Sequence, residues 1–205
     1  MKTIKVFKDK QRLQFLQESC EGIDLYSHLV SLGSFNKQES QFYISTILLT
    51  VSYLHSVDIL HRDLKPENFL IDSSGHLKLV EVSTCKKIKD RTFTLVGTPC
   101  YTAPEAFLLS GYGLASDFWS IGVCLFEFMT GRLPFGEDTD DPLKIFQEIL
   151  ENKEISFPRE CRDTHCMDLI RRLLRKEPEE RLCNLRKIQK HPWFSSFDFV
   201  SISVP

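Results

Sequence analysis

The chain has 205 residues, and its 26 lysines and arginines nearly balance its 28 aspartates and glutamates, for a formal charge of −2. The balance leaves no positive excess to hold nucleic acid, and a hydrophobic content of 42% suffices for one buried core. No apolar run approaches the roughly 18 residues of a membrane helix, and the charged start lacks the apolar run of a signal peptide, so we expect neither membrane insertion nor secretion.

The cysteines indicate a reducing compartment. There are seven of them, an odd number, with no C-x-x-C pairing and no histidine at zinc-finger spacing. This pattern argues against a disulfide framework and against a zinc site. We therefore expect free thiols and a cytoplasmic protein.

Glycine is absent from the start of the chain: the first of nine is Gly22, so no glycine-rich phosphate loop lies among the first 21 residues. Residues 4–18 instead form two short apolar runs around a charged turn, which predicts a β-hairpin. A polar bend is expected next, at Glu21-Gly22.

A long amphipathic helix is predicted from Asn36 onward, because apolar residues recur at i, i+3 and i+4 spacing and Asn36 with Glu39 resembles a capping box. Residues 57–82 then predict short strands between loops, since Pro66 and the polar stretch that ends at Gly75 interrupt the apolar runs. We expect no strand beyond residue 82.

Residues 116–130 predict a buried central helix, because they are apolar on nearly every face. Ser116 is its candidate N-cap and Gly131 its end. Further helical patterns follow at 142–152, 164–175 and 184–190. The expected fold class is therefore mainly α (α+β), with strands confined to its first part.

The strongest chemical signal is the string HRDLKPEN at residues 61–68, which lies between the long helix and a short strand. A phosphoryl transfer needs an oriented hydroxyl nucleophile and a metal ion. Asp63 can accept the hydroxyl proton, Asn68 can bind the metal from the same loop, and Lys65 can neutralise charge on the transferred group. Single residues of these types are common in loops, whereas the whole string is highly specific.

The string matches the catalytic loop of protein kinases, and other kinase segments follow in the order that the family requires. They are Gly97-Thr98-Pro99, Ala103-Pro104-Glu105, Asp117-Phe118-Trp119, Arg181 and His191-Pro192-Trp193-Phe194. Over essentially its whole length the chain resembles Ser/Thr kinases of the AGC group, most of all the cyclic-nucleotide-dependent kinases. The resemblance implies a large helical lobe at 19–205, preceded at 1–18 by the last two strands of a small lobe.

The resemblance also implies ATP and Mg²⁺ as cofactors, protein substrates with basic residues near the target Ser or Thr, and a regulatory domain or subunit outside this chain. It implies roles for individual residues: catalysis for Asp63, Lys65, Asn68 and Thr98; nucleotide binding for Glu18, Cys20, Asp24 and Leu70; metal binding for Asn68 and Glu81; substrate recognition for Glu67 and Glu127; and an activating phosphate on Thr94, with Arg62 and Lys86 as its cationic partners. It further implies that Asp117 bonds the backbone of the catalytic loop and that Glu105 pairs with Arg181.

Two departures from the family pattern bear on activity. Glu81-Val82-Ser83 stands where the family has D-F-G, and the longer carboxylate displaces oxygens for which Mg²⁺ demands near-octahedral geometry. The family's glycine-rich loop, strand lysine and helix glutamate have no counterpart before Glu18. Only 12 residues separate Lys5 from Glu18, too few for a helix of about 8–20 residues and two strands, so Lys5 is a poor candidate for the phosphate-binding lysine.

These departures leave three alternatives open. The chain is a kinase catalytic domain that lacks the first part of its small lobe, a pseudokinase that serves as a protein-binding or regulatory scaffold, or an incomplete gene model. For the 205-residue chain alone, we expect little or no phosphotransfer.

Overall fold

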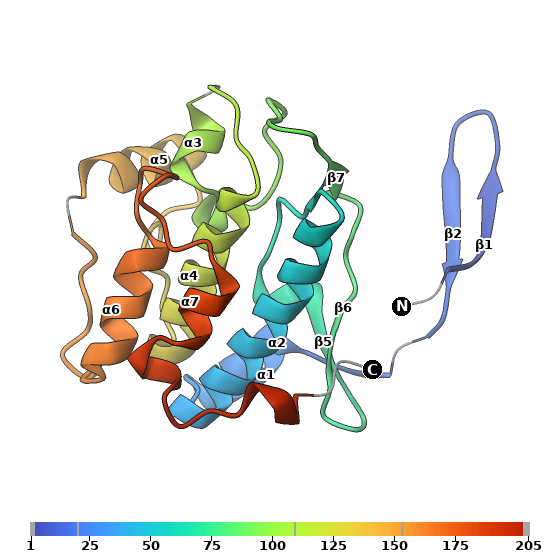
Figure 1. Ribbon diagram of the computed structural model, residues 1–205. Coiled ribbons are helices and arrows are strands. Elements are labelled where there is room, and N and C mark those ends of the chain that lie inside the picture. The colour runs from blue at the N-terminus through green and yellow to red at the C-terminus, as the bar shows by residue number, and fades with distance from the viewer. Residues whose placement is uncertain (1–2, 20, 109, 153, 203–205) are drawn as a thin grey trace.

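A computed structural model shows the fold and describes residues 3–19, 21–108, 110–152 and 154–202 (Figure 1). The strands are β1 (Thr3–Lys8), β2 (Leu13–Gln17), β3 (Gly22–Asp24), β4 (Ile59–Leu60), β5 (Phe69–Asp72), β6 (Leu77–Leu79) and β7 (Lys86–Lys87). The helices are α1 (Leu25–Leu32), α2 (Lys37–Ser56), α3 (Pro104–Phe107), α4 (Ala115–Thr130), α5 (Pro142–Glu151), α6 (Thr164–Leu173) and α7 (Leu185–Gln189). The prediction of a mainly helical fold with short strands is confirmed.

Helix α2 begins with the capping box that the sequence predicted. The Asn36 side chain accepts hydrogen bonds from the amides of Gln38 and Glu39, and the Glu39 carboxylate accepts one from the Asn36 amide at 2.8 Å. These bonds satisfy donors that every helix N-terminus leaves unpaired.

Helix α4 is the buried centre of the helical body and lies between α2 and α6, both of which it contacts (Figure 1). It ends as predicted at Gly131, whose φ of 69° is left-handed. The prediction of Ser116 as N-cap is wrong: the N-cap is Leu114, and the Ser116 hydroxyl, inside the first turn, donates to the Gly113 carbonyl at 2.8 Å.

Short antiparallel strands connect the helices. Strands β3, β5 and β6 form one sheet in that order, and β4 pairs with β7. The expectation that no strand follows residue 82 is therefore wrong. Strand β7 has only two residues, both exposed lysines, so its sequence carries no apolar alternation that would reveal it.

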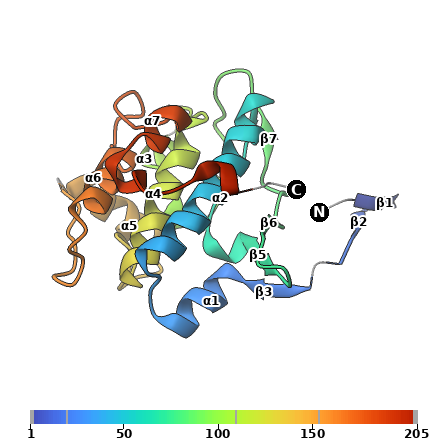
Figure 2. The same ribbon diagram turned by 60° about the horizontal axis from the view of Figure 1, so that its bottom comes forward.

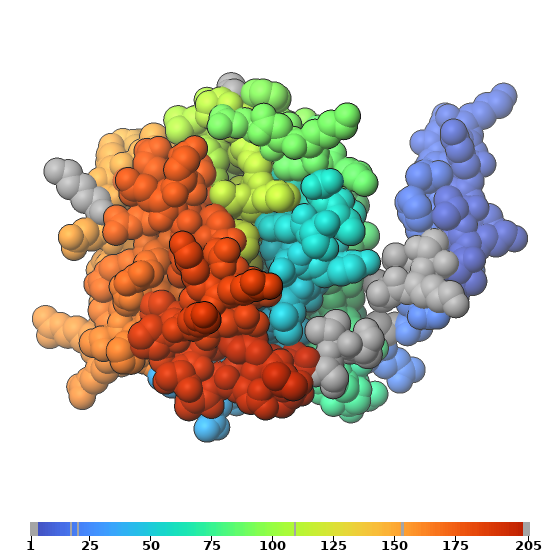
Figure 3. Space-filling model, in the orientation of Figure 1, coloured from blue at the N-terminus to red at the C-terminus, as the bar shows by residue number. Residues whose placement is uncertain are grey.

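Strands β1 and β2 form the predicted hairpin, which stands apart from the helical body (Figures 1, 2 and 3). Its apolar side chains are largely exposed: Val6 by 50%, Phe7 by 45% and Phe15 by 58%. Among the described residues, the main buried core begins at Leu25, so the hairpin contributes no side chain to it.

A buried ion pair joins distant parts of the helical body. Arg181 donates from its two terminal nitrogens to the two carboxylate oxygens of Glu105, at 2.6 and 2.9 Å, and both residues are buried. The guanidinium also donates to the carbonyls of Arg175, Ala115 and Lys176. The predicted pairing of Glu105 with Arg181 is confirmed, with every donor of the guanidinium group engaged near the start of α4.

Replacing Arg181 with leucine leaves the Glu105 carboxylate buried and unpaired. We expect Arg181→Leu to lower the free energy of unfolding by about 3–5 kcal/mol, measured by urea denaturation. The matched control is Arg172→Leu, which removes an exposed pair with Asp168 (3.0 Å; 56% and 46% exposed) and should cost less than about 1 kcal/mol. Equal costs for the two variants would contradict this account.

Candidate active site

The loop at residues 61–68 is anchored to the central helix by one carboxylate. Asp117 of α4 accepts hydrogen bonds from the backbone amides of His61 and Arg62, each at 3.0 Å, and from His55 at 2.7 Å. Its exposed fraction is 1%, so these bonds are shielded from water. The predicted contact between Asp117 and the loop backbone is confirmed.

The loop backbone is bent sharply at the anchored position. Arg62 has a φ of 74°, in the left-handed region that non-glycine residues rarely adopt. Gly97, with a φ of 112°, lies against this bend: a Cβ at residue 97 would be 2.5 Å from the Arg62 carbonyl oxygen. Glycine is therefore needed at residue 97 for conformation and for space.

Three candidate catalytic residues converge on this loop. Asp63 accepts hydrogen bonds from the amide and the hydroxyl of Thr98, at 3.0 and 2.9 Å. The side-chain amide nitrogen of Asn68 donates to the Asp63 carbonyl at 2.6 Å and to its carboxylate at 3.2 Å. The fourth candidate, Lys65, has its ammonium 4.0 Å from the Glu67 carboxylate on the same loop. The carboxylate of Asp63 is thus held in place from two segments of the chain.

The candidate metal ligands come from the ends of β5 and β6. Both hydrogen bonds of the Asn68 side chain use its nitrogen, which leaves its oxygen available to a cation. The Val80 amide donates to the Asn68 carbonyl at 3.0 Å, which brings the next residue, Glu81, to the same end of the sheet. One Glu81 oxygen accepts a hydrogen bond from the Ser83 amide at 2.6 Å, and the His61 ring contacts the Glu81 carbonyl at 2.9 Å.

These two side chains fit Mg²⁺ in kind. Mg²⁺ prefers oxygen ligands and is usually bound through one or two carboxylates together with substrate phosphates. Hydrogen bonds from Ser83, most strongly from its side chain and next from its backbone amide, hold the pKa of Glu81 below its usual range, so its carboxylate is ionised. Within the described ranges, no three His, Cys, Asp or Glu side chains lie together as a metal cage.

Two candidate nucleotide-binding residues are neighbours in the sheet. Asp24 at the end of β3 is the cross-strand partner of Leu70 in β5. Asp24 also caps α1: its carboxylate accepts from the amide and hydroxyl of Ser27 at 2.8 and 2.7 Å, and the Ser27 hydroxyl most strongly lowers its pKa. Of the two hinge candidates, Glu18 is exposed and Cys20 lies outside the described residues.

The capping role of Asp24, and α1 itself, were not predicted from the sequence. The signal was present, because Asp followed by an apolar-rich run is a helix start signature. The polar pair Glu21-Gly22 just before it indicates only a bend, although Gly22 opens β3 in the structure.

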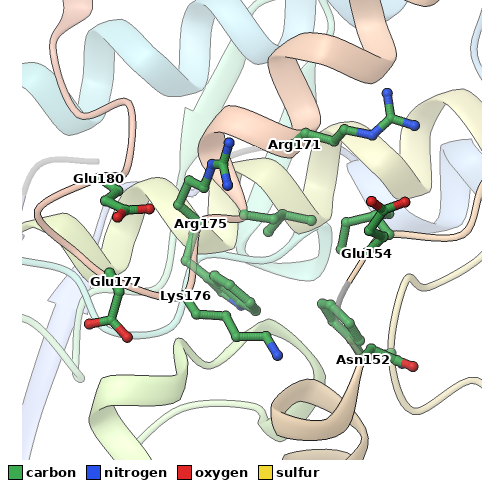
Figure 4. Close-up of a pocket in the computed structure, with 11 residues that line it drawn as sticks. Asn152, Glu154, Arg171, Arg175, Lys176, Glu177 and Glu180 are labelled. Atoms are coloured by element: carbon green, nitrogen blue, oxygen red, sulfur yellow. The ribbon is translucent and has the colours of Figure 1, made fainter.

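One hollow of about 600 Å³ lies away from these residues, between α6 and the segment that follows α5 (Figure 4). Arg171, Arg175 and Lys176 face it together with three glutamates, so its rim carries balanced charge. None of the candidate catalytic or nucleotide-binding residues lines it. The candidate site therefore lies at the loop of residues 61–68 and not at this hollow.

Comparison with known proteins agrees with this geometry. Residues 1–194 match the family model described as the protein kinase domain. The chain belongs to the protein kinase family. It is 45% identical over 203 residues to a cGMP-dependent protein kinase of Eimeria tenella, in a match that covers 97% of this chain and 20% of that protein.

Two other relatives give the same picture. The chain is 41% identical to the human cAMP-dependent protein kinase catalytic subunit PRKX, over 95% of this chain and 54% of that protein. It is also 41% identical to isozyme 2 forms cD5/T2 of the Drosophila melanogaster cGMP-dependent protein kinase, over 96% of this chain and 22% of that protein. The chain thus spans about a fifth to a half of the length of these relatives.

No described helix is long and apolar enough to cross a membrane.

The two candidate residues for substrate recognition, Glu67 and Glu127, differ in burial. Glu67 is exposed at the loop, whereas Glu127 of α4 is only 6% exposed and accepts a 2.6 Å hydrogen bond from the Tyr101 hydroxyl. Burial raises the pKa of Glu127 to about 7, and the charge of Glu67 adds to the increase. Tyr101 was not predicted as part of the site, since one tyrosine after Cys100 carries no signal of its own.

The candidate phosphosite Thr94 is exposed, and its carbonyl accepts a hydrogen bond from the Tyr112 hydroxyl at 2.7 Å. The expected cationic partners bond elsewhere. Arg62 donates to the Thr84 carbonyl at 2.6 Å, and the Lys86 ammonium donates to the Thr92 hydroxyl at 2.9 Å. In this structure, therefore, the two cations hold the backbone and Thr92 rather than the Thr94 side chain.

The contact between Gly97 and Arg62 can be tested by adding one methyl group. Gly97→Ala should lower the free energy of unfolding by more than about 2 kcal/mol, because the new Cβ meets backbone and the φ is unfavourable. Gly75→Ala is the matched control: its φ is also positive, at 84°, but its Cβ would meet nothing within 4 Å. Urea denaturation of both variants measures the difference, and a cost at Gly97 no larger than at Gly75 would refute the contact.

Proposed function

We propose that this chain is the catalytic lobe of a serine/threonine protein kinase, which transfers the γ-phosphate of ATP to Ser or Thr of protein substrates. The observation that carries the proposal is the Asp63 carboxylate, held by Thr98 and Asn68 at hydrogen-bonding distances on a loop anchored by Asp117. The cGMP-dependent and cAMP-dependent kinases among its relatives support the same assignment.

In this mechanism, Asp63 orients the substrate hydroxyl and accepts its proton. Thr98 fixes the carboxylate, and Lys65, two residues further along the loop, neutralises charge on the phosphoryl group. Asp24 and Leu70 would hold the nucleoside, with Glu18 and Cys20 at the hinge.

The Asn68 oxygen and the Glu81 carboxylate would hold Mg²⁺. The bound ATP and Mg²⁺ would supply the transferable group and neutralise its charge. Because Glu81 is one methylene longer than aspartate and one of its oxygens is engaged by the Ser83 amide, we expect slow phosphotransfer.

The metal position gives the most direct kinetic prediction. Glu81→Asp should raise the rate of Mg-ATP-dependent phosphorylation of a basic serine peptide by about 10- to 100-fold, because a displaced oxygen returns to coordinating distance. Asp63→Asn should reduce any measured rate by about 10²–10⁴-fold, because the general base is removed. The measurement is incorporation of labelled phosphate into the peptide.

A second candidate function is a non-catalytic pseudokinase that binds protein partners. The contact between Glu81 and the Ser83 amide favours it, because it occupies a carboxylate oxygen that catalysis would need. Retained peptide binding with no phosphotransfer from Glu81→Asp would favour this alternative over slow catalysis limited by Glu81. A rate that Asp63→Asn leaves unchanged would contradict the kinase assignment.

The proposed substrates carry basic residues upstream of the target Ser or Thr, recognised by Glu67 and Glu127. The pKa of Glu127, near 7, makes this recognition dependent on pH. As the pH falls from 8 to 6, Glu127 takes up a proton and loses its charge, so the Kd of an arginine-containing peptide should rise several-fold. Glu127→Gln should bind the peptide weakly at both values, measured by fluorescence anisotropy, and an equal pH dependence in both proteins would contradict the role of Glu127.

The raised pKa of Glu127 also affects stability, in the opposite direction to peptide binding: the ionised carboxylate binds the peptide better but destabilises the fold. A carboxyl group whose pKa is raised on folding costs stability once it ionises, so the cost is absent below about pH 4.5 and complete above about pH 7. Glu127→Gln should therefore be more stable than the wild type at pH 8, by about 1–3 kcal/mol, and this gain should shrink as the pH falls.

The remaining assignments are proposals of the same kind. The six described cysteines are free, which supports a reducing, cytoplasmic location. Thr94 is proposed as the activating phosphosite because it is exposed and stands at the position where the family carries its activating phosphate. A regulatory domain or subunit outside this chain is proposed because the cGMP-dependent relatives are about five times longer. The near-neutral net charge supports protein rather than nucleic-acid partners.

A further inference from the structure

The segment at residues 81–84, which we call the Glu81 segment, contributes no buried side chain. Glu81 and Thr84 are partly buried, Ser83 is exposed, and Val82 is 47% exposed. Elsewhere in the protein kinase family, the aromatic side chain at the position of Val82 packs into the fold and so sets the active state. In this chain that apolar packing is largely lost, so polar contacts hold the Glu81 segment in place.

Two hydrogen bonds connect Thr84 to the sharp bend in the loop at residues 61–68. The Thr84 hydroxyl donates to the His61 carbonyl at 2.9 Å, and Arg62 donates from its Nε to the Thr84 carbonyl at 2.6 Å. His61 is fully buried, so water does not readily replace a hydrogen bond that is lost at its carbonyl. The hydroxyl of Thr84 therefore satisfies a buried acceptor next to the bend.

The His61 ring extends this connection to the proposed base. Its Nε2 contacts the Glu81 carbonyl at 2.9 Å, and its Nδ1 lies 3.3 Å from the Asp63 amide, from which it accepts a hydrogen bond. Because Nδ1 accepts, the ring proton is on Nε2, which donates to Glu81. The backbone of a candidate metal ligand and the backbone of the proposed base are thus joined through one imidazole ring.

We propose that Thr84 is a positioning residue for the metal-binding side of the proposed active site. Its hydroxyl holds the Glu81 segment on the His61 carbonyl and so fixes the position of Glu81 relative to Asp63. The inference rests on the proposed function, since it takes Glu81 as a metal ligand and Asp63 as the base. A buried hydrogen bond thus performs the task that a packed aromatic side chain performs elsewhere in the family.

Hydrogen exchange in the full 205-residue chain tests this role without requiring catalysis. Thr84→Val keeps a branched side chain of similar size but removes the donor. The reporter is the Cys85 amide, which donates to the Val82 carbonyl at 3.1 Å and closes the turn around Thr84. We expect this amide to exchange about 5- to 50-fold faster in Thr84→Val than in the wild type, and the Ser83 amide to lose protection as well. Thr84→Ser keeps the donor and should restore the protection of both amides.

The matched control removes a hydroxyl from another threonine. The Thr50 hydroxyl donates to the Thr46 carbonyl at 2.8 Å inside α2, away from the Glu81 segment. Thr50→Val should therefore leave the Ser83 and Cys85 amides as protected as in the wild type. Amides in the middle of α4 should keep their protection in every variant, which shows that the variant is folded. If valine does not fit at residue 84, Thr84→Ala removes the same donor and takes its place.

Binding of Mn²⁺, used as the probe, measures the effect on the proposed metal site. Mn²⁺ takes the same kinds of oxygen ligand as Mg²⁺, and its paramagnetism broadens the NMR signals of groups near it. The side-chain amide signal of Asn68 is the reporter. Thr84→Val should need about tenfold more Mn²⁺ than the wild type or Thr84→Ser for the same broadening, because the position of Glu81 is no longer fixed.

Three results would overturn the proposal: unchanged exchange in Thr84→Val, the same loss of protection in Thr50→Val, or equal Mn²⁺ dependence in Thr84→Val and the wild type. Failure of the proposed function is distinguishable. If Mn²⁺ does not broaden the Asn68 signal even in the wild type, the proposed metal site is rejected, and faster exchange in Thr84→Val would still retain the positioning of the Glu81 segment by Thr84.

Discussion

The carboxylate of Asp117 is the contact on which the proposed active site depends. It is carried by the most deeply buried helix and accepts the amides of His61 and Arg62, which precede the proposed catalytic base. A buried carboxylate with charge-assisted hydrogen bonds is expensive to leave unpaired, so the bend in the loop is stabilised against the strain of a left-handed Arg62. The position of Asp63 is therefore set by the core of the protein and not by the loop alone.

Backbone contacts between short segments position the rest of the site around this loop. The segment around Gly97 approaches the Arg62 carbonyl and places Thr98 on Asp63, while β3, β5 and β6 bring Asp24, Leu70, Asn68 and Glu81 to one small sheet. Each of these strands has at most four residues. Helices α1 and α2 contact these strands, so the packing of the helical body and the geometry of the proposed site are coupled.

Local signals in the sequence predicted much of this arrangement. The capping box at Asn36, the left-handed Gly131 and the string at residues 61–68 each depend on near neighbours in the chain, and each appears in the structure. Contacts between distant segments without a family pattern were not predictable. The pairing of β4 with β7 and the bond from Lys86 to Thr92 follow from how the helical body folds. Ser116 failed as a cap because the N-cap lies two residues earlier, at Leu114, than its polar side chain suggests.

Hydrogen exchange at the His61 and Arg62 amides in the Asp117→Asn variant tests the central claim most directly. An asparagine side chain offers one acceptor oxygen in place of two, so at least one of these amides loses its partner. The account predicts that one or both amides exchange about 10- to 100-fold faster than in the wild type, while amides in the middle of α2 keep their protection. Asp168→Asn, which alters an exposed carboxylate on α6, is the control and should leave both amides protected. Unchanged protection of His61 and Arg62 in Asp117→Asn would show that the loop is held by something other than the central helix.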